Sequence, residues 1–246
     1  MNRNIELKKY HKAMEHSYSF GAFPTIELLK NQPQKVIKIY IHTDMTSISQ
    51  AELLDDLCNR HTIPLEYNNR VVEKLRDKEN CLMIGVFEKY KSHLNASENH
   101  VVLVNPSDMG NMGTIIRTCV GFGIQNLAII EPGVDVFHPK AVRASMGSLF
   151  QINITYFSSF AEYQKQFTKR KIYPFMLKGA VELGSFVHNQ EDRFSLVFGN
   201  EATGLDDSFL EAGVSVYIPH THKIDSLNLS LAVGIGVYEF TKNTIL

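Results

Sequence analysis

The sequence has few cysteines, and they lie far apart. Cys58, Cys81 and Cys119 are odd in number and widely separated, so they predict neither a disulfide framework nor a C-x-x-C metal site. Cys58 and Cys119 fall in helix-like, partly apolar segments, where a free cysteine behaves as a small hydrophobic residue. We therefore expect both side chains to lie in the core.

Long apolar runs are also missing. No run reaches the ~18–20 residues that a membrane-spanning helix needs. The first residues, MNRNIELKKYHKAMEHSYSF, are too polar for a secretory signal. Hydrophobic residues make up 44% of the chain and charged residues 21%, which is typical of a globular protein. The sequence therefore predicts a cytoplasmic protein with no membrane partner.

A strong charge of either sign is absent as well. The formal net charge is −1, so the overall balance does not indicate a nucleic-acid partner. The distribution is uneven, because residues 1–38 contain seven lysines and arginines against three glutamates. A basic face there suits phosphate binding, and a solvated helix face explains the same residues equally well.

What the sequence does contain is an alternation of strands and helices in two blocks. In the first block, the patterns predict strands at 36–42, 63–67 and 81–87, with helices at 48–61 and 69–77. A polar segment without periodicity follows and reads as a linker. We place an N-terminal domain at residues 1–90, the linker at 91–100 and a second domain at 101–246.

The second block repeats the alternation over a longer stretch. It predicts helices near 112–123, 139–150 and 158–171 between strands near 100–106, 126–132, 152–157, 172–177, 194–199 and 214–219. This pattern indicates an α/β fold with a mostly parallel sheet and helices on both faces. Such sheets bind ligands at the carboxyl ends of their strands, which directs attention to the loops after Val104, Leu177, Gly199 and Ile218.

The first polar loop is NPSDMGNMGTIIRT, residues 105–118. Glycine-rich loops between a strand and a helix often hold phosphate at the helix N-terminus. This loop has neither the P-loop nor the G-x-G-x-x-G spacing, so a plain tight turn is the alternative. Arg117 is flanked by apolar residues, which places it near the sheet and predicts an anionic partner.

The second polar loop is LVFGNEATGL, residues 196–205, in which Glu201 follows a buried-looking strand. A carboxylate at the carboxyl end of a strand is a candidate for a functional site. Capping of the backbone N–H groups of the next helix is the structural alternative, and the two roles are compatible.

The third segment is IPHTHKIDSLNLSLAVGIGVYEF, residues 218–240. Leu227, Leu231, Ile235 and Tyr238 recur at helical spacing, with Asp225 or Ser226 as the N-cap. The alternation of leucines also fits a strand, but the length of the run, to about residue 241, favours a helix.

In this order and at these spacings, the three segments resemble the SpoU/TrmH family of RNA ribose 2′-O-methyltransferases, within the SPOUT superfamily. The stretches DMGNMGTIIR, FGNEATGL and IPHTHKIDSLNLSLA match the three motifs of that family. Asp108 stands where the first motif usually has Asn. The match covers residues ~100–240, and the N-terminal block is similar, more loosely, to an L30e-like RNA-binding domain.

The resemblance implies a fold and a function that spacing alone does not show. It implies a deep trefoil knot in the second domain, S-adenosylmethionine as the cofactor, and a homodimer. The expected activity is 2′-O-methylation of RNA, with ribosomal RNA preferred to transfer RNA because L30e-like domains suit ribosomal RNA. The alternatives are a transfer RNA 2′-O-methyltransferase and a non-catalytic RNA-binding or ribosome-assembly protein that keeps the fold.

The resemblance also assigns roles to single residues. Arg117 would hold a substrate phosphate and stabilise the developing alkoxide, and Glu201 would position Arg117 or bind substrate. The full catalytic set is Arg117, Asn111, Glu201, Ser226 and Asn228, and the cofactor set is Leu177, Lys178, Gly179, Gly199, Ile218 and Leu227. Two structural alternatives stay open, a helix cap for Ser226 and a satisfied loop carbonyl for Asn228.

One part of the third motif departs from the family pattern. Pro219-His220-Thr221-His222 stands where the family often has P-M-x-G, in a loop implied to bind the cofactor. His220 and His222 have the spacing of a metal-ligand pair. No third ligand is placed with them, so we expect no metal site and a contact with substrate or cofactor instead.

Overall fold

The protein forms two compact units. The computed structural model describes residues 6–45, 48–185, 192–221 and 223–244, with backbone only at 48–51. Unit 1 comprises the chain up to Tyr90 together with Asp135–Phe150, and unit 2 comprises Lys91–Val134 and the chain from Gln151 onward. Residues 135–150, which the sequence analysis assigned to the second domain, therefore pack within unit 1.

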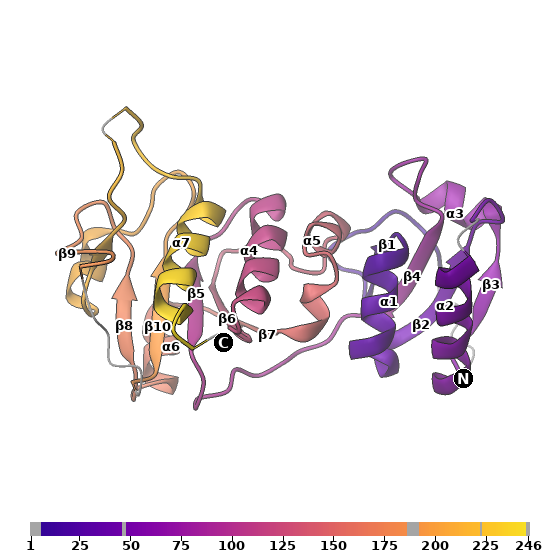
Figure 1. Ribbon diagram of the computed structural model, residues 1–246, viewed down its shortest axis with the longest axis horizontal. Helices are drawn as coiled ribbons and strands as arrows, with labels where there is room; N and C mark the ends of the chain where they lie inside the picture. Colours follow the sequence, from indigo (N-terminus) through magenta and orange to yellow (C-terminus); the bar gives the residue numbers. More distant parts are fainter. Residues whose placement is uncertain (1–5, 46–47, 186–191, 222, 245–246) are drawn as a thin grey trace. The chain divides into compact units, whose positions relative to one another are not determined.

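Unit 1 is built on a four-stranded sheet in the order β1-β4-β2-β3 (Figure 1). Neighbouring strands are antiparallel except β2 and β3, which are parallel. Buried side chains form a cluster on each face of the sheet. The elements are β1 (His16–Phe20), α1 (Ala22–Asn31), η1 (Pro33–Lys35), β2 (Val36–Ile41), α2 (Ile48–His61), β3 (Leu65–Tyr67), α3 (Asn69–Leu75), β4 (Met83–Glu88) and α5 (Pro139–Ala144).

The patterns at 36–42, 63–67 and 81–87 are confirmed as strands, but β1 was not predicted. Its serines explain why. Ser17 and Ser19 are fully buried, which alternating serines and aromatic residues do not suggest. Ser17 Oγ donates to the Phe137 carbonyl at 2.5 Å, and Ser19 Oγ lies 2.8 Å from Thr25 Oγ1. The face of β1 that carries the serines is thus buried by α1 and by the segment before α5. Local sequence pattern cannot predict this burial, because the segment before α5 lies more than 100 residues later in the chain.

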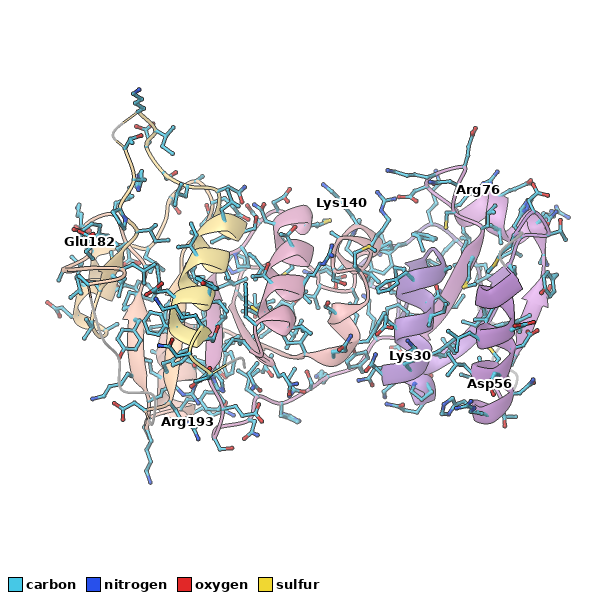
Figure 2. All side chains as sticks on the ribbon, in the orientation of Figure 1. Lys30, Asp56, Arg76, Lys140, Glu182 and Arg193 are labelled. Carbon is cyan, nitrogen blue, oxygen red and sulfur yellow. The ribbon has the colours of Figure 1, made fainter. Side chains whose placement is uncertain are left out.

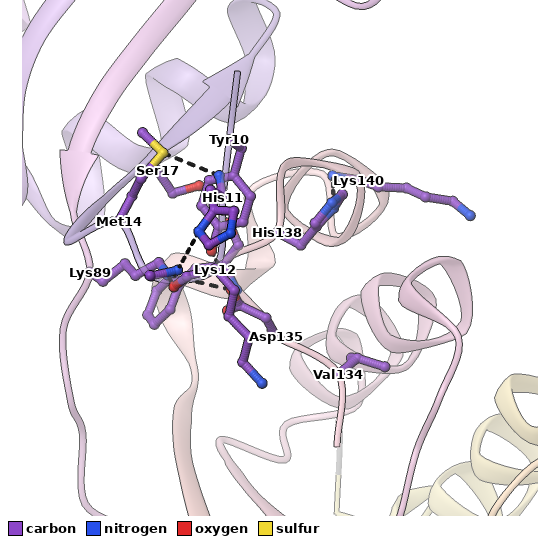
Figure 3. Close-up of polar contacts among 12 residues, drawn as sticks. Tyr10, His11, Lys12, Met14, Ser17, Lys89, Val134, Asp135, His138 and Lys140 are labelled. Carbon is purple, nitrogen blue, oxygen red and sulfur yellow. Dashed lines mark hydrogen bonds and ion pairs between the residues drawn. The ribbon is translucent and has the colours of Figure 1, made fainter. Parts of the chain in front are cut away.

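The segment before α5 is fixed to the N-terminal residues by a small polar cluster (Figure 3). Asp135 accepts hydrogen bonds from the Tyr10 hydroxyl and, at 3.4 Å, from Lys89 Nζ. Lys89 Nζ also donates to the Lys12 carbonyl at 2.7 Å and lies 4.9 Å from the centroid of the Tyr10 ring. The His138 ring meets the edge of Tyr10 at a centroid distance of 5.3 Å. These contacts tie residues 135–138 into unit 1.

The predicted helix at 139–150 is shorter than expected. It ends at Ala144, and a 3₁₀ turn, η2 (Ser148–Gln151), follows. Met146 and Gly147 between them have positive φ angles of 49° and 83°. A Cβ at Gly147 would lie 2.5 Å from Glu27 Cβ, so glycine permits both the turn and the close packing on α1.

Unit 2 is built on a five-stranded parallel sheet in the order β7-β6-β5-β10-β8. This confirms the predicted α/β class. Helices α4 and α7 lie side by side on one face (Figure 1), and α6 packs on the other. The elements are β5 (His100–Val104), α4 (Met109–Gly121), β6 (Asn126–Ile130), β7 (Asn153–Phe157), α6 (Phe160–Gln166), β8 (Lys171–Pro174), β9 (Val181–Glu182), β10 (Phe194–Phe198), η3 (Asp207–Glu211), β11 (Val216–Tyr217) and α7 (Leu229–Thr241).

The order of these strands decides where a site can form. Strands β6 and β7 extend the sheet on one side of β5, whereas β10 and β8 lie on the other side. The direction of winding therefore reverses between β5 and β10, and the loops that leave their carboxyl ends diverge there. These two loops are the first and second polar loops of the sequence.

Buried side chains at the opposite ends of β5 and β10 form a connected polar network. His100, which is fully buried, lies 2.8 Å from the Tyr163 hydroxyl through Nδ1 and 2.9 Å from the Asn95 carbonyl through Nε2. The Tyr163 hydroxyl is 2.5 Å from Ser195 Oγ, to which Arg170 donates at 3.3 Å. A carbonyl can only accept, so His100 carries its proton on Nε2. Burial, and then the Arg170 cation, lower the pKa of His100 to about 3.

Candidate functional site

Glu201 joins the loop after β10 to the start of α4. Its carboxylate accepts from Ser107 N at 3.0 Å, Ser107 Oγ at 2.8 Å and Asp108 N at 3.1 Å. Partial burial raises the pKa of Glu201, but hydrogen bonds from its own backbone N–H, from Ser107 and from Asp108 outweigh that effect and lower the pKa. Glu201 therefore holds the first polar loop as an anion at neutral pH.

The partners of Glu201 differ from those expected of a cap. The sequence suggested a cap on the helix that follows Glu201, whereas its bonds go to N–H groups before α4, far earlier in the chain. Asp108 is itself the N-cap of α4 and accepts from Asn111 N at 2.7 Å. Two carboxylates thus order one helix start, where the positive end of the helix dipole favours negative charge.

A chain of side-chain amides then links all three motifs. Asn111 Nδ2 donates to Glu201 at 3.4 Å, and Asn228 Nδ2 donates to Asn111 Oδ1 at 3.2 Å. Asn228 Oδ1 accepts from Ser230 N at 2.9 Å and from Ser230 Oγ at 2.7 Å. Asn228 is therefore the N-cap of α7, and the prediction of Asp225 or Ser226 in that position is wrong.

Arg117 lies on the exposed side of α4, and the expectation that it lies near the sheet is wrong. Its buried neighbours, Ile115 and Ile116, pack inward instead. Within the described residues, Arg117 has no hydrogen bond or ion pair, and Glu201 is committed to the loop before α4. The guanidinium is therefore available to bind an anion that comes from outside these residues.

A cavity of about 490 Å³ opens beside this network. It lies at the carboxyl ends of β8 and β10 and the start of α7. Five of the six predicted cofactor residues line it, namely Leu177, Lys178, Gly199, Ile218 and Leu227, together with Glu201 and Ser226. Arg117, Asn111, Asn228 and Gly179 are not among the lining residues. The cavity thus joins residues that are separated along the chain, whereas three of the predicted catalytic residues stand outside it.

Two glycines of the predicted cofactor set are needed for close packing. A Cβ at Gly199 would lie 2.1 Å from the carbonyl carbon of Gly204, because the loop folds back through a bond from Gly204 N to the Asn200 carbonyl. A Cβ at Gly179 would lie 2.5 Å from the carbonyl carbon of Val216. Gly179 thus permits the chain after β8 to approach β11, which is a structural role outside the cavity.

The cavity also has lining residues that the sequence analysis did not identify. Most of them have apolar side chains, namely Phe175, Met176, Phe198, Ala202, Leu205, Val216, Leu229 and Ala232. An apolar residue near a strand end looks like any core residue, so no local signal could have identified them. Two exposed side chains of the lining, Lys178 and Asp207, pair with each other, because Lys178 Nζ lies 3.2 Å from both Asp207 oxygens.

The volume and chemistry of the cavity fit a nucleoside-sized ligand. Ligand pockets typically measure ~300–1,000 Å³ and combine apolar walls with a few polar groups. The polar groups here include Ser226, His220 and the backbone at Gly199 and Ile218. Among the described residues, no group of three or more His, Cys, Asp or Glu side chains could hold a metal ion. His222 lies outside the described residues.

The apolar stripe predicted for α7 faces outward. Leu231 is 60% exposed, Ile235 41% and Tyr238 51%, so the residues that recur at helical spacing lie on the outer side of the helix. The buried side of α7 is formed by Leu229, Val233, Gly236, Val237 and Phe240. The helix therefore carries apolar residues on both sides, of which one has no partner among the described residues. Among all the residues that the structure describes, no helix is long and apolar enough to cross a membrane.

Comparison with known proteins agrees with these features. The model of the SpoU rRNA Methylase family matches residues 98–238, more than half of the chain. RlmP of Bacillus subtilis (strain 168), a 23S rRNA (guanosine(2553)-2′-O)-methyltransferase, is 29% identical over 147 residues, which span 58% of each protein. The 23S rRNA (adenosine(1067)-2′-O)-methyltransferase of Streptomyces azureus is 26% identical over 213 residues, 82% of this chain and 78% of that protein.

Solved structures share the fold. The crystal structure of an AdoMet-bound rRNA methyltransferase from Sinorhizobium meliloti matches with a TM-score of 0.78 and 24% identity. The match covers 94% of this chain and 89% of that chain, so it includes both units.

Proposed function

Because the chain belongs to the SpoU rRNA methylase family, we propose that it is an S-adenosylmethionine-dependent RNA 2′-O-ribose methyltransferase. The observation that carries the proposal is the hydrogen-bonded chain from Glu201 through Asn111 to Asn228, which unites the three motifs beside a nucleoside-sized cavity. The rRNA 2′-O-methyltransferase names of its relatives support the same activity.

The cavity residues would hold the methyl donor. Leu177, Ile218 and Leu227 offer apolar walls, whereas Gly199 and its neighbours offer backbone groups without a side chain in the way. Lys178 also lines the cavity, and Gly179 supports the loop from outside. When bound, S-adenosylmethionine supplies a methyl group already activated on a sulfonium centre. The protein therefore mainly has to position the RNA hydroxyl and stabilise the charge that develops on it.

Arg117 is the residue best suited to the RNA side of the reaction. A guanidinium has five donors, no acceptor and a permanent charge, so it binds a phosphate and stabilises a developing alkoxide but does not take up the proton. Ser226 lines the cavity and is exposed, so its hydroxyl can meet a ligand. Asn111 and Asn228 are engaged with each other, which suits positioning residues that hold the loops around the RNA ribose.

The RNA partner is proposed to be ribosomal RNA in preference to transfer RNA. The relative from Streptomyces azureus, which is named for 23S rRNA, aligns over 82% of the chain. Within unit 1, we propose residues 1–90 as an L30e-like domain, and the unit as a whole would bind structured RNA. Lys30 and Lys140, labelled in Figure 2, are among its exposed basic residues. A cytoplasmic location fits an RNA-modifying role.

A homodimer and a trefoil knot complete the proposal. The outer side of α7, with Leu231, Ile235 and Tyr238, offers an apolar surface that a second copy of the chain could cover. Arg117 is on α4, which packs against α7, so a partner would complete the surroundings of the catalytic arginine. The knot would be formed by the chain between β10 and α7.

The deciding experiment measures transfer of a labelled methyl group to total RNA. Arg117→Ala should lower the transfer rate by about 100-fold or more, because donors aimed at developing charge typically contribute that much. Lys165→Ala, which removes an exposed cation on α6, on the other face of the unit 2 sheet from α4, is the control and should retain activity. Equal rates for wild type and Arg117→Ala would refute the role of Arg117. No detectable binding of S-adenosylmethionine at millimolar concentration would favour a non-catalytic RNA-binding protein.

A further inference from the structure

His220 is the polar residue of the cavity that the proposed mechanism leaves without a role. It follows β11 in the loop of the third motif, at the position where the family often has methionine. The side chain is half-buried and lines the cavity together with Ile218, Leu177 and Leu227. An imidazole in this position adds hydrogen-bonding capacity to a wall that is otherwise largely apolar.

The orientation of the ring decides what His220 can offer. Nδ1 lies 2.8 Å from the Ile218 carbonyl oxygen, two residues earlier in the same loop. A carbonyl oxygen only accepts, so Nδ1 carries the proton in this contact. In the neutral ring, Nε2 is then an acceptor with a free lone pair. The bond to Ile218 thus fixes both the direction of the ring and its tautomer.

Four of the other polar side chains of the cavity are engaged by partners within the protein. Lys178 pairs with Asp207, and Glu201 accepts from Ser107 and Asp108. Asn200 donates to the Asn105 carbonyl and accepts from Ala202 N and Thr203 N. Among the described residues, Nε2 of His220 makes no hydrogen bond.

We propose that His220 is a specificity-determining residue for the methyl donor. Its Nε2 accepts a hydrogen bond from an N–H or O–H group of the S-adenosyl compound, whereas the thioether of a methionine at this position would be only a weak acceptor. The inference rests on the proposed function, because it concerns the donor of that reaction. The lining of the cavity favours donor binding over a role as proton acceptor, since Arg117, Asn111 and Asn228, the residues proposed to handle the RNA, stand outside it.

Calorimetric titration of the full chain with S-adenosylmethionine tests the contact through four variants. His220→Met removes both ring nitrogens, and His220→Asn keeps a donor near Nδ1 but nothing near Nε2. His220→Gln keeps a polar group near Nε2. His61→Met, in an exposed position of unit 1, is the matched control.

The expected result is a three- to tenfold loss of affinity, on the order of one hydrogen bond, in His220→Met and His220→Asn. His220→Gln should stay within about twofold of wild type, and His61→Met should not differ from it. Melting temperatures measured in parallel show whether each variant is folded, and the Asn and Gln variants decide the matter if the Met variant is not.

Three results would overturn the inference. Unchanged affinity in both His220→Met and His220→Asn would mean that Nε2 makes no contact with the donor. Retained affinity in His220→Asn with loss in His220→Gln would assign the role to the Nδ1 bond that shapes the loop. Normal donor binding in all variants, with slow single-turnover methyl transfer, would make His220 a proton acceptor. Failure of the wild-type protein to bind the donor would instead refute the proposed function itself.

Discussion

At the scale of single residues, Glu201 has the most consequential contacts in the site. Its two oxygens hold three backbone or hydroxyl donors at the start of α4 and the amide of Asn111. The sequence identified the residue but not its partners, because those partners lie 90 or more positions earlier. Glu201 therefore acts on the RNA site through the loop that it holds.

We predict that Glu201→Gln lowers the free energy of unfolding by about 1–2 kcal/mol at neutral pH. The amide turns one acceptor into a donor that faces other donors, and the partial exposure of the carboxylate to solvent limits the loss. Urea denaturation measures the change, with Glu211→Gln on η3 as an exposed control.

The folded-state pKa of Glu201 lies below its ordinary value of 4.5. The stabilisation is therefore complete above that value, and the difference between wild type and variant should vanish in stronger acid.

His100 predicts a second pH dependence of the free energy of unfolding, because its buried ring stays neutral in the folded protein. Its pKa falls from 6.5 to about 3 on folding, so the unfolded chain binds a proton that the folded chain excludes. The contribution of neutral His100 to stability should be fully present above pH 6.5. The free energy of unfolding should then fall by about 1.4 kcal/mol per pH unit as the pH drops from 6.5 toward 3. His100→Gln keeps a donor and an acceptor but cannot titrate in this range.

The measurement is the free energy of unfolding at pH 7.5, 6.0 and 5.0 for both proteins. The other histidines contribute equally to each, so the slope difference belongs to His100. Parallel slopes for wild type and His100→Gln would show that the buried network accommodates the charged ring.

At the scale of elements, α7 shows how a helix tolerates two glycines. A Cβ at Gly236 would lie 2.8 Å from the Phe175 ring and 3.0 Å from the Phe198 ring. These rings stack on each other at a centroid distance of 4.4 Å, so neither can move alone. Gly234, in contrast, would place its Cβ 3.7 Å from Thr118 Cγ2, which is ordinary contact. The glycine at 236 is thus required by packing, whereas that at 234 is not.

We predict opposite effects for the two alanine substitutions. Gly236→Ala should lower the free energy of unfolding by about 1–3 kcal/mol through overpacking. Gly234→Ala should raise it by up to ~1 kcal/mol, because alanine has the higher helix propensity and the site has room for a methyl group. Thermal or urea unfolding of the pair is the test. Equal destabilisation by both would mean that helix propensity and local space do not control this helix.

At the scale of the whole molecule, the outer side of α7 predicts the oligomeric state. Leu231→Asp places a charge in the middle of the exposed apolar surface, where a second copy would have to bury it without a partner. We expect the variant to sediment as a monomer and the wild type as a dimer. Leu53→Asp, at an exposed leucine of α2, is the control and should leave the dimer intact. A monomeric wild type would contradict the proposed homodimer.

Much of this molecule was predictable from local pattern. The alternation of strands and helices predicted the α/β class, because side-chain periodicity reports local conformation. The linear motifs identified the family, and the length of the last apolar run predicted α7. Helix α6 begins after Ser159, a typical N-cap residue, whose hydroxyl accepts from Glu162 N. These features depend on neighbours within a few positions.

What the sequence by itself determined, then, is the set of elements and the chemistry carried at their ends. The tertiary structure alone decided which ends meet. Strand order placed β10 beside β5, so that Glu201 reached the loop before α4 and Asn228 reached Asn111. Burial of β1 and exposure of Leu231 likewise depend on segments far along the chain. The physical reason is range: backbone conformation follows from adjacent residues, whereas a hydrogen bond between loops exists only after the sheet has brought them together.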